Sequence, residues 1–210
     1  MKIAILNYNI GNLASVRNAL EFCAKTSKHT EICIESSPSA LRHYDKIILP
    51  GVGAFGDSIK HLQANGMDQA IHEFVKSGKY LLGICLGMQL LLHKSYEFGS
   101  HRGLGLIQGE VVKFKNLDFL KIPQIGWNTC LLTDEGRKHP LFKDYPQKFY
   151  LYFVHSFHAT DIALQDTLAF SKYGYSFPSI IARENVLGIQ PHPEKSHNLG
   201  LKLLENFIAL

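Results

Sequence analysis

The sequence predicts an α/β fold: a mostly parallel central sheet with flanking helices, extended by antiparallel or mixed strands in the second half of the chain. Short apolar runs alternate with segments of helical periodicity over the first hundred residues. This alternation is typical of a parallel sheet covered by helices on both faces. After Gly99 the strand-like runs follow one another closely, with little helix between them, which favours antiparallel or mixed pairing.

In the first half, short apolar runs predict buried strands, and apolar residues recurring every three or four positions predict helices. Val16, Leu20 and Cys23 show the helical spacing, Pro50-Gly51 breaks the third strand, and Asn65-Gly66 separates two helices. The expected elements are, in order, strand 2–6, helix 12–24, strands 31–35 and 45–51, helices 53–66 and 67–78, strand 79–84 and helix 86–95.

The second half is expected to hold strands over residues 109–114, 127–133, 148–157, 167–174, 179–184 and 186–190. A helix over residues 196–210 closes the chain, because Leu199, Leu203 and Phe207 repeat at four-residue intervals and Ser196 suits an N-cap. No linker, repeat or low-complexity tract interrupts these segments. We therefore expect one domain spanning residues 1–210.

The composition excludes several classes of protein. The 210 residues are 46% hydrophobic, enough for a sizeable core, and no apolar run approaches the length needed to span a membrane. The net charge of +4 is mild and no cluster of Lys and Arg indicates nucleic-acid binding. The four cysteines include no CxxC pair and the N-terminus carries no signal peptide, so we expect a reducing, cytoplasmic location.

Cys85 is the first candidate catalytic residue. It lies in LLGICLGMQLL (81–91), between Gly83 and Gly87, where an expected strand passes into a helix. This is the context of the G-x-S-x-G nucleophile elbow, with cysteine in place of serine. A helix starting after Cys85 favours the thiolate, and the N–H of Leu86 can face a developing oxyanion. A buried core cysteine is the alternative.

His192 and Glu194, in GIQPHPEKS (188–196), provide partners for that cysteine. Pro193 disfavours helix at His192, and in an extended chain the side chains at i and i+2 point the same way. Glu194 can therefore orient His192 as a general acid and base for Cys85. The alternative is a solvated loop containing His-Pro-Glu by chance.

GICLGMQLL (83–91) and HPEKS (192–196) together resemble the signature of the class I glutamine amidotransferases. Four more motifs occur in the expected order: IGNLASV (10–16), LPGVGAF (49–55), IGWN (125–128) and YFVHSF (152–157). They are similar to those of the glutaminase-subunit family of imidazole glycerol phosphate synthase, a histidine-pathway enzyme. The resemblance covers essentially the whole chain.

The resemblance implies a glutaminase that hydrolyses L-glutamine to glutamate and ammonia through a cysteine thioester. Cys85 is then the nucleophile, His192 the proton carrier and Glu194 the orienting carboxylate. It implies a heterodimer in which ammonia passes to a (β/α)8-barrel cyclase subunit. No metal or other cofactor is implied, and the 11 histidines include no HExxH pattern.

The same resemblance assigns the remaining site residues. The oxyanion strand corresponds to Pro50, Gly51, Val52 and Gly53, and in it the N–H of Val52 joins that of Leu86; an ordinary strand-ending turn is the alternative. The glutamine-binding positions are Gln89 and the backbone of His155, Ser156 and Phe157, for which simple packing is the alternative. Asn12, Trp127 and Asn128 correspond to positions near the synthase interface, although Trp127 could instead belong to the core.

Three residues depart from the pattern of the histidine-pathway family: Asn7 replaces a frequent acidic residue, Gln124 a frequent histidine, and Pro191 an aromatic residue. None removes a catalytic group. They leave open a related glutaminase that supplies ammonia to a different synthase, such as one acting on a sugar. A non-catalytic binding subunit and a γ-glutamyl peptidase that works alone are further alternatives.

Overall fold

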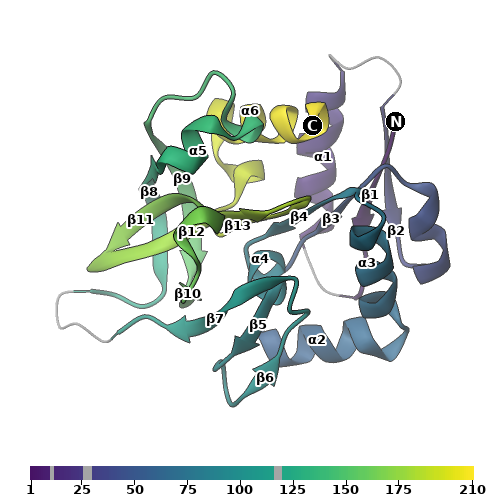
Figure 1. Cartoon of the computed structure of the whole chain (residues 1–210), viewed down its shortest axis with the longest axis horizontal. Helices are drawn as coiled ribbons and strands as arrows, with labels where there is room; N and C mark the ends of the chain where they lie inside the picture. Colours follow the sequence, from purple (N-terminus) through teal and green to yellow (C-terminus); the bar gives the residue numbers. More distant parts are fainter. Residues whose placement is uncertain (10–11, 26–29, 116–119) are drawn as a thin grey trace.

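The computed structural model describes residues 1–9, 12–25, 30–115 and 120–210, and it contains a nine-stranded mixed sheet with helices on both faces (Figure 1). The strands of this sheet, in spatial order, are β2 (Glu31–Glu35), β1 (Lys2–Leu6), β3 (Lys46–Leu49), β4 (Tyr80–Ile84), β13 (Val186–Ile189), β12 (Tyr175–Arg183), β11 (Thr167–Tyr173), β8 (Gln124–Leu132) and β9 (Lys148–His155). The first five are parallel to one another, and every pairing from β13 to β9 is antiparallel. The predicted fold class is confirmed.

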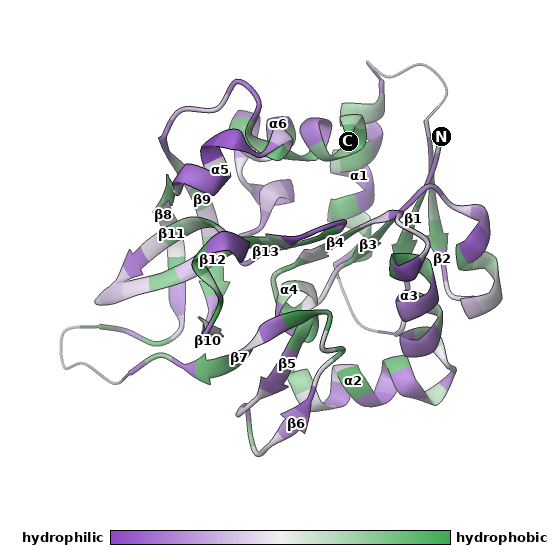
Figure 2. Cartoon of the chain, in the orientation of Figure 1, coloured by the Kyte–Doolittle hydropathy of each residue, from purple (hydrophilic) through white to green (hydrophobic). Residues whose placement is uncertain are grey.

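Two groups of helices cover the parallel half of the sheet. One face carries α1 (Leu13–Ala24) and α6 (His197–Ala209); the other carries α2 (Phe55–Ala64), α3 (Met67–Lys76) and α4 (Leu86–Leu90) (Figure 1). Alternate residues of β1 enter the two cores: Ile3 and Ile5 pack on the side of α1 and α6, Ala4 and Leu6 on the side of α2 and α3. Burial on both faces explains why the central strands are apolar along their length (Figure 2).

A second sheet of four strands extends the molecule beside α4. Its spatial order is β10 (Phe157–Thr160), β7 (Ile107–Lys113), β5 (Leu92–Ser95) and β6 (His101–Arg102). The remaining helical segments are α5 (Asp134–Lys138) and 3₁₀ helices at Pro38–His43, Pro140–Phe142, Leu164–Asp166 and Pro193–Lys195. Among the described residues, no helix is both long and apolar enough to cross a membrane.

Most predicted elements are found with ends shifted by one to four residues, as at β8 and β12, but two differ in kind. The helix expected over 86–95 is wrong beyond Leu90, because Leu92–Ser95 forms β5 and pairs with β7. The strand expected over 148–157 is interrupted at Ser156, so that β9 joins the large sheet and β10 the small one. In both places an apolar run fits either continuation, and pairing with a distant strand decides between them.

Ser196 stands at the N-cap position of α6, but its side chain makes no capping bond to the helix. Its hydroxyl donates to the carbonyl of His192 (2.6 Å) and accepts from the N–H of Tyr152 (2.9 Å). The predicted cap is therefore wrong in its bonding. The hydroxyl instead fixes the loop that carries His192.

Candidate active site

The three motifs that the sequence singles out meet at one edge of the parallel sheet. Strands β3, β4 and β13 are neighbours and run parallel, so their carboxyl ends lie side by side. Residues 50–53 follow β3, Cys85 follows β4, and residues 190–194 follow β13. Ligands in open α/β sheets bind at this edge.

Cys85 occupies a sharp turn between β4 and α4. Its backbone angles, φ 54° and ψ −111°, are rare for a residue other than glycine. The turn brings α4 against the end of β3: a Cβ on Gly87 would lie 1.8 Å from the carbonyl oxygen of Leu49. The two flanking glycines of the motif are thus required by close packing, and the geometry is that of a nucleophile elbow.

His192 and Glu194 form a buried pair beside Cys85. His192 Nδ1 lies 2.7 Å from Glu194 Oε1, and because a carboxylate only accepts, Nδ1 carries the proton. The backbone N–H of His192 donates to the carbonyl of Tyr152 (2.8 Å), which holds the residue against β9. Within the described residues Nε2 has no hydrogen-bond partner, so this nitrogen is open for proton transfer.

The protonation of His192 depends on its two neighbours. Burial by itself lowers the pKa of the imidazole, but Cys85 and the Glu194 carboxylate outweigh it and raise the pKa of His192 to about 10. The imidazolium is thereby stabilised next to the cysteine sulfur. A proton on His192 is what a leaving amine requires.

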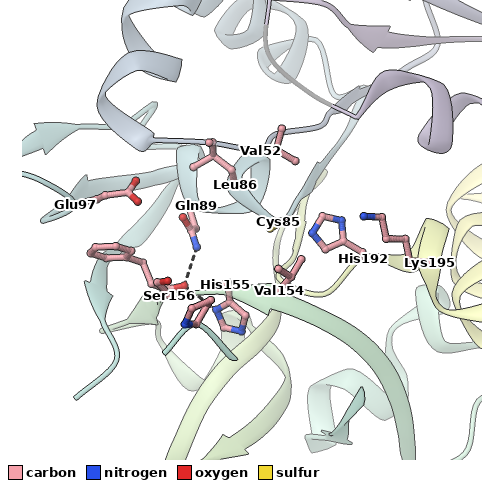
Figure 3. Close-up of a pocket in the computed structure, with 13 residues that line it drawn as sticks. Val52, Cys85, Leu86, Gln89, Glu97, Val154, His155, Ser156, His192 and Lys195 are labelled. Atoms are coloured by element: carbon pink, nitrogen blue, oxygen red, sulfur yellow. Dashed lines mark hydrogen bonds between the residues drawn. The ribbon is translucent and has the colours of Figure 1, made fainter. Parts of the chain in front are cut away.

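A cavity of about 340 Å³ opens in front of these residues. Figure 3 shows Gln89 and Glu97 on one side of Cys85 and His192 on the other. The lining residues are Val52, Gly53, Cys85, Leu86, Gln89, Glu97, Pro123, Val154, His155, Ser156, Phe157, His192 and Lys195. The volume suits a small polar molecule of amino-acid size.

Val52 and Gly53 line part of the cavity wall. The side chain of Val52 is 41% exposed, and Gly53 has φ +99°, a conformation that side chains rarely adopt. Val52 and Leu86 both line the cavity next to Cys85. Their backbone N–H groups are therefore the candidates for stabilising an oxyanion formed on a substrate that Cys85 attacks.

The predicted glutamine-binding residues lie together. Gln89 is only 5% exposed, and its amide donates to the carbonyl of Phe157 (2.9 Å), to which His155 Nδ1 also donates (2.8 Å). Burial lowers the pKa of His155 to about 3, so its ring is neutral. The carbonyl of Ser156 accepts from the N–H of Phe114 (3.0 Å). These bonds fix the strand ends that line the cavity, which shows a packing role, and glutamine binding by these residues stays a prediction.

Gln190 and Glu97 also belong to this site and were not predicted. Gln190 is fully buried; its Oε1 accepts from Gln89 (3.0 Å) and its Nε2 lies 3.7 Å from Cys85 Sγ. The signal available was its place two residues before His192 in GIQPHPEKS, although the chain bends at Gln190 and Pro191. Glu97 lines the cavity while its Oε2 accepts from the N–H of Phe55 (2.6 Å). It follows β5, where the sequence predicted a helix.

The three predicted interface residues do not lie in the core. Trp127 is 47% exposed and stacks on His197, with ring centroids 5.2 Å apart and planes at 4°. Asn128 donates to the carbonyl of Lys172 (3.0 Å), and Asn12 is half-buried before α1. The rest of the IGN motif, Ile10 and Gly11, lies outside the described residues.

The departures from the family pattern leave the catalytic geometry in place. Pro191 is buried next to His192, whose own N–H bond to Tyr152 is made. Gln124 is buried where β8 begins, opposite His155 in the β8–β9 register. The N–H of Asn7 donates to the carbonyl of Glu35 (2.8 Å) beyond the end of β1.

Comparison with known proteins agrees with this geometry. Residues 7–210 match the family model described as glutamine amidotransferase class-I. The chain is 55% identical to the imidazole glycerol phosphate synthase subunit HisH of Wolinella succinogenes, over 99% of each protein. It is 51% identical to the HisH subunit of Helicobacter hepaticus, covering 100% of this chain and 99% of that protein.

Among solved structures, PurLQS from Thermotoga maritima has a similar fold. The TM-score is 0.76 at 19% sequence identity, covering 99% of this chain and 97% of that chain. At this identity the likeness concerns the fold alone. The full-length sequence matches favour a HisH-type subunit over the alternatives that Asn7, Gln124 and Pro191 left open.

Proposed function

The chain belongs to the class I glutamine amidotransferases and, among them, to the glutaminase subunits of imidazole glycerol phosphate synthase, and we propose that Cys85, His192 and Glu194 carry out its hydrolysis of glutamine. The observation that carries this proposal is the strained elbow of Cys85 beside the buried His192–Glu194 pair. A nucleophile, a base and an orienting carboxylate in this order form a triad.

In the first half-reaction, Cys85 Sγ attacks the side-chain amide carbon of glutamine, and the carbonyl electrons move to oxygen. The N–H groups of Val52 and Leu86 stabilise the oxyanion. The intermediate collapses as His192 gives its Nε2 proton to the departing nitrogen, which releases ammonia and leaves a γ-glutamyl thioester on Cys85. Glu194 holds the imidazole in place throughout.

In the second half-reaction, His192 takes a proton from water as the water oxygen attacks the thioester carbon. The second tetrahedral intermediate forms in the same oxyanion site and collapses with loss of the Cys85 thiolate. Glutamate is the product, and the thiolate and the imidazolium are restored together. This chemistry uses only groups of the chain and one water molecule.

The cavity suggests how glutamine is held. Glu97 presents a carboxylate on the side away from His192 (Figure 3), and it suits the α-ammonium group of the substrate. Gln89 and the strand end at Ser156 and Phe157 border the space between Glu97 and Cys85. In this proposal the side-chain amide of glutamine points toward the sulfur.

The partner subunit is proposed to be a (β/α)8-barrel cyclase, as the family resemblance implies, bound in a heterodimer. The outward face of β8 and β9 supports this placement: Ile125 is 62% exposed, Leu131 50% and Tyr150 53%, and large exposed apolar patches mark interaction sites. Val154, which pairs with Ile125, lines the active-site cavity. A partner on this face therefore lies near the point of ammonia release. The cytoplasm, where thiols stay reduced, is the proposed location.

The test is glutamine turnover of the purified chain, alone and with the cyclase of the same organism plus its ribulosyl substrate. We expect strong stimulation by the complex, and no turnover by Cys85→Ala in either state. Cys130→Ala, which changes a buried cysteine outside the cavity, is the matched control and should keep its activity if it folds. If the Cys85→Ala variant hydrolyses glutamine at the wild-type rate, Cys85 is excluded as the nucleophile.

A further inference from the structure

Tyr8 lies just beyond the carboxyl end of β1, and the reaction described above gives it no role. Its side chain is 2% exposed, and its hydroxyl donates a hydrogen bond of 2.6 Å to the carbonyl oxygen of Pro50. Pro50 begins the oxyanion strand. Burial raises the pKa of the Tyr8 phenol, so the hydroxyl keeps its proton at neutral pH and remains a donor.

The bond to Pro50 controls more than one atom. The carbonyl of Pro50 and the N–H of Gly51 belong to the same planar peptide group, so fixing the oxygen fixes the direction of both. The hydroxyl also packs against the next residue: a Cβ on Gly51 would lie 3.0 Å from the Tyr8 oxygen and 2.8 Å from the backbone nitrogen of Gly87. The start of the oxyanion strand is therefore held between Tyr8 and the elbow helix.

The other end of the strand is held separately. Glu97 Oε2 accepts from the N–H of Phe55, the first residue of α2 (2.6 Å). Between these fixed points, no hydrogen bond to the N–H of Gly51, Val52 or Gly53 is formed by the described residues. Val52 is 41% exposed. The part of the strand that can rotate is thus confined to the peptides between the two anchors.

We propose that Tyr8 is a positioning residue for glutamine hydrolysis: its hydroxyl holds the Pro50–Gly51 peptide still, so that only the Gly51–Val52 peptide turns its N–H toward the oxyanion. A single peptide group rotates by opposite changes in ψ of one residue and φ of the next, which leaves its neighbours in place. Tyr8 acts on the reaction through the backbone of the oxyanion strand and the N–H of Val52. This inference rests on the proposed function of the Val52 N–H.

The variant Tyr8→Phe removes the hydroxyl and keeps the ring. In the complex with the cyclase, we expect kcat for glutamine to fall roughly five- to tenfold, the size of one net hydrogen bond, while KM stays within about twofold. The rate at which iodoacetamide alkylates Cys85 should not change, because displacement at its CH₂ carbon forms no oxyanion. Tyr44→Phe, which removes a hydroxyl bonded to Glu35 outside the site (2.9 Å), is the matched control.

An unchanged kcat in Tyr8→Phe, or a parallel fall in kcat and in alkylation rate, would overturn the positioning role. If the wild-type complex itself does not hydrolyse glutamine, the proposed function fails, and the role of Tyr8 is judged by nitrogen-15 relaxation dispersion at Gly51 and Val52. Exchange broadening at Gly51 that appears in Tyr8→Phe but not in Tyr44→Phe supports the anchor. Equal dispersion at Gly51 in wild type and both variants refutes it.

Discussion

The proton between His192 and Glu194 is the smallest feature on which the proposed reaction depends. The imidazole must deliver a proton to the departing nitrogen, which leaves as ammonia, and then remove one from water, so its orientation and charge both matter. The 2.7 Å bond to Glu194 fixes the ring, and Cys85 with Glu194 raises the pKa of His192 to about 10 against the effect of burial. Glu194 therefore contributes in two ways: its hydrogen bond orients the ring, and its negative charge raises the pKa of His192.

The variant Glu194→Gln tests that charge. It keeps the size of the side chain, but an amide does not raise the pKa of His192 and can favour the wrong tautomer. We expect kcat to fall by roughly 10³- to 10⁴-fold, as for other triads that lose this carboxylate. The pKa of His192, followed by NMR of its ring protons, should fall below about 10. The control is Glu73→Gln, which removes a carboxylate on the exposed side of α3. Equal activity of the two variants would contradict the assignment of Glu194 to the catalytic triad.

The residues of the site differ in how far the sequence predicts them. Cys85 is found from a short-range rule, the glycines around a strand–helix switch. The His192–Glu194 pair is also found, but by a rule that is only half right: His192 is extended, whereas Glu194 lies in the 3₁₀ turn Pro193–Lys195. Gln190, two residues before His192, was missed because an amide suggests no chemistry until Gln89 and Cys85 lie beside it. Tyr8 has no local signal at all, since its partner Pro50 is 42 residues away.

At the scale of elements, the elbow works because α4 packs directly on the end of β3. Gly87→Ala should be strongly destabilising, since the added Cβ would lie 1.8 Å from the carbonyl oxygen of Leu49 and 3.3 Å from the carbonyl carbon of Pro50. We expect a loss of about 2–4 kcal/mol in the free energy of unfolding, at or above the usual cost of overpacking. Urea denaturation measures it.

Gly105→Ala provides the matched control for that substitution. Gly105 has φ +67°, and a Cβ there would have nothing within 4 Å, so only backbone strain applies, of about 1 kcal/mol. A smaller loss in Gly87→Ala than in Gly105→Ala would mean that α4 can shift away from β3. The close packing would then not explain the glycine.

The predicted elements succeed where local periodicity and burial agree. Strands β1, β3 and β4 are buried on both faces, which makes them continuous apolar runs, and α1 shows one apolar stripe. The misassigned stretch at Leu92–Ser95 fails this condition. Leu92 and Ser95 are buried and His93 is exposed, a pattern that both a helix and a short strand can give, and only pairing with β7 settles it.

At the scale of the whole molecule, Lys46 joins the central sheet to the closing helix. It lies at the start of β3, 6% exposed, and its Nζ donates to the carbonyls of Phe207 (2.9 Å) and Ile208 (2.8 Å) in the last turn of α6. Burial lowers the pKa of Lys46 to about 8, whereas an unfolded lysine titrates near 10.4. Between these values the unfolded chain binds more protons than the folded one.

Stability contributed by Lys46 should therefore rise with pH across that window, from about 8 to about 10.4, and stay at its lower level below pH 8. We expect the free energy of unfolding of wild type, minus that of Lys46→Met, to increase by about 1–2 kcal/mol between pH 7.5 and 10. Other titrating groups cancel in the difference. Urea denaturation at several pH values measures this difference in the free energy of unfolding. The control is Lys79→Met, which removes hydrogen bonds to two backbone carbonyls at a half-exposed site. A difference that is flat or falls with pH contradicts the argument.

Partner binding is the property that involves the molecule as a whole, because ammonia has to leave the cavity toward a second active site. Trp127 lies on the exposed face of β8, 47% exposed and held by its stack on His197, and rigid aromatic side chains dominate many interfaces. We expect Trp127→Ala to weaken binding of the cyclase by about 30-fold or more, corresponding to about 2 kcal/mol, measured by titration calorimetry.

The control is Phe22→Ala, which removes an aromatic ring 55% exposed on α1 and should leave the Kd for the cyclase unchanged. If both variants bind equally well, the partner docks on another face. If Trp127→Ala alone binds weakly while Cys85 still reacts with iodoacetamide at the wild-type rate, the loss belongs to the interface and not to the active site.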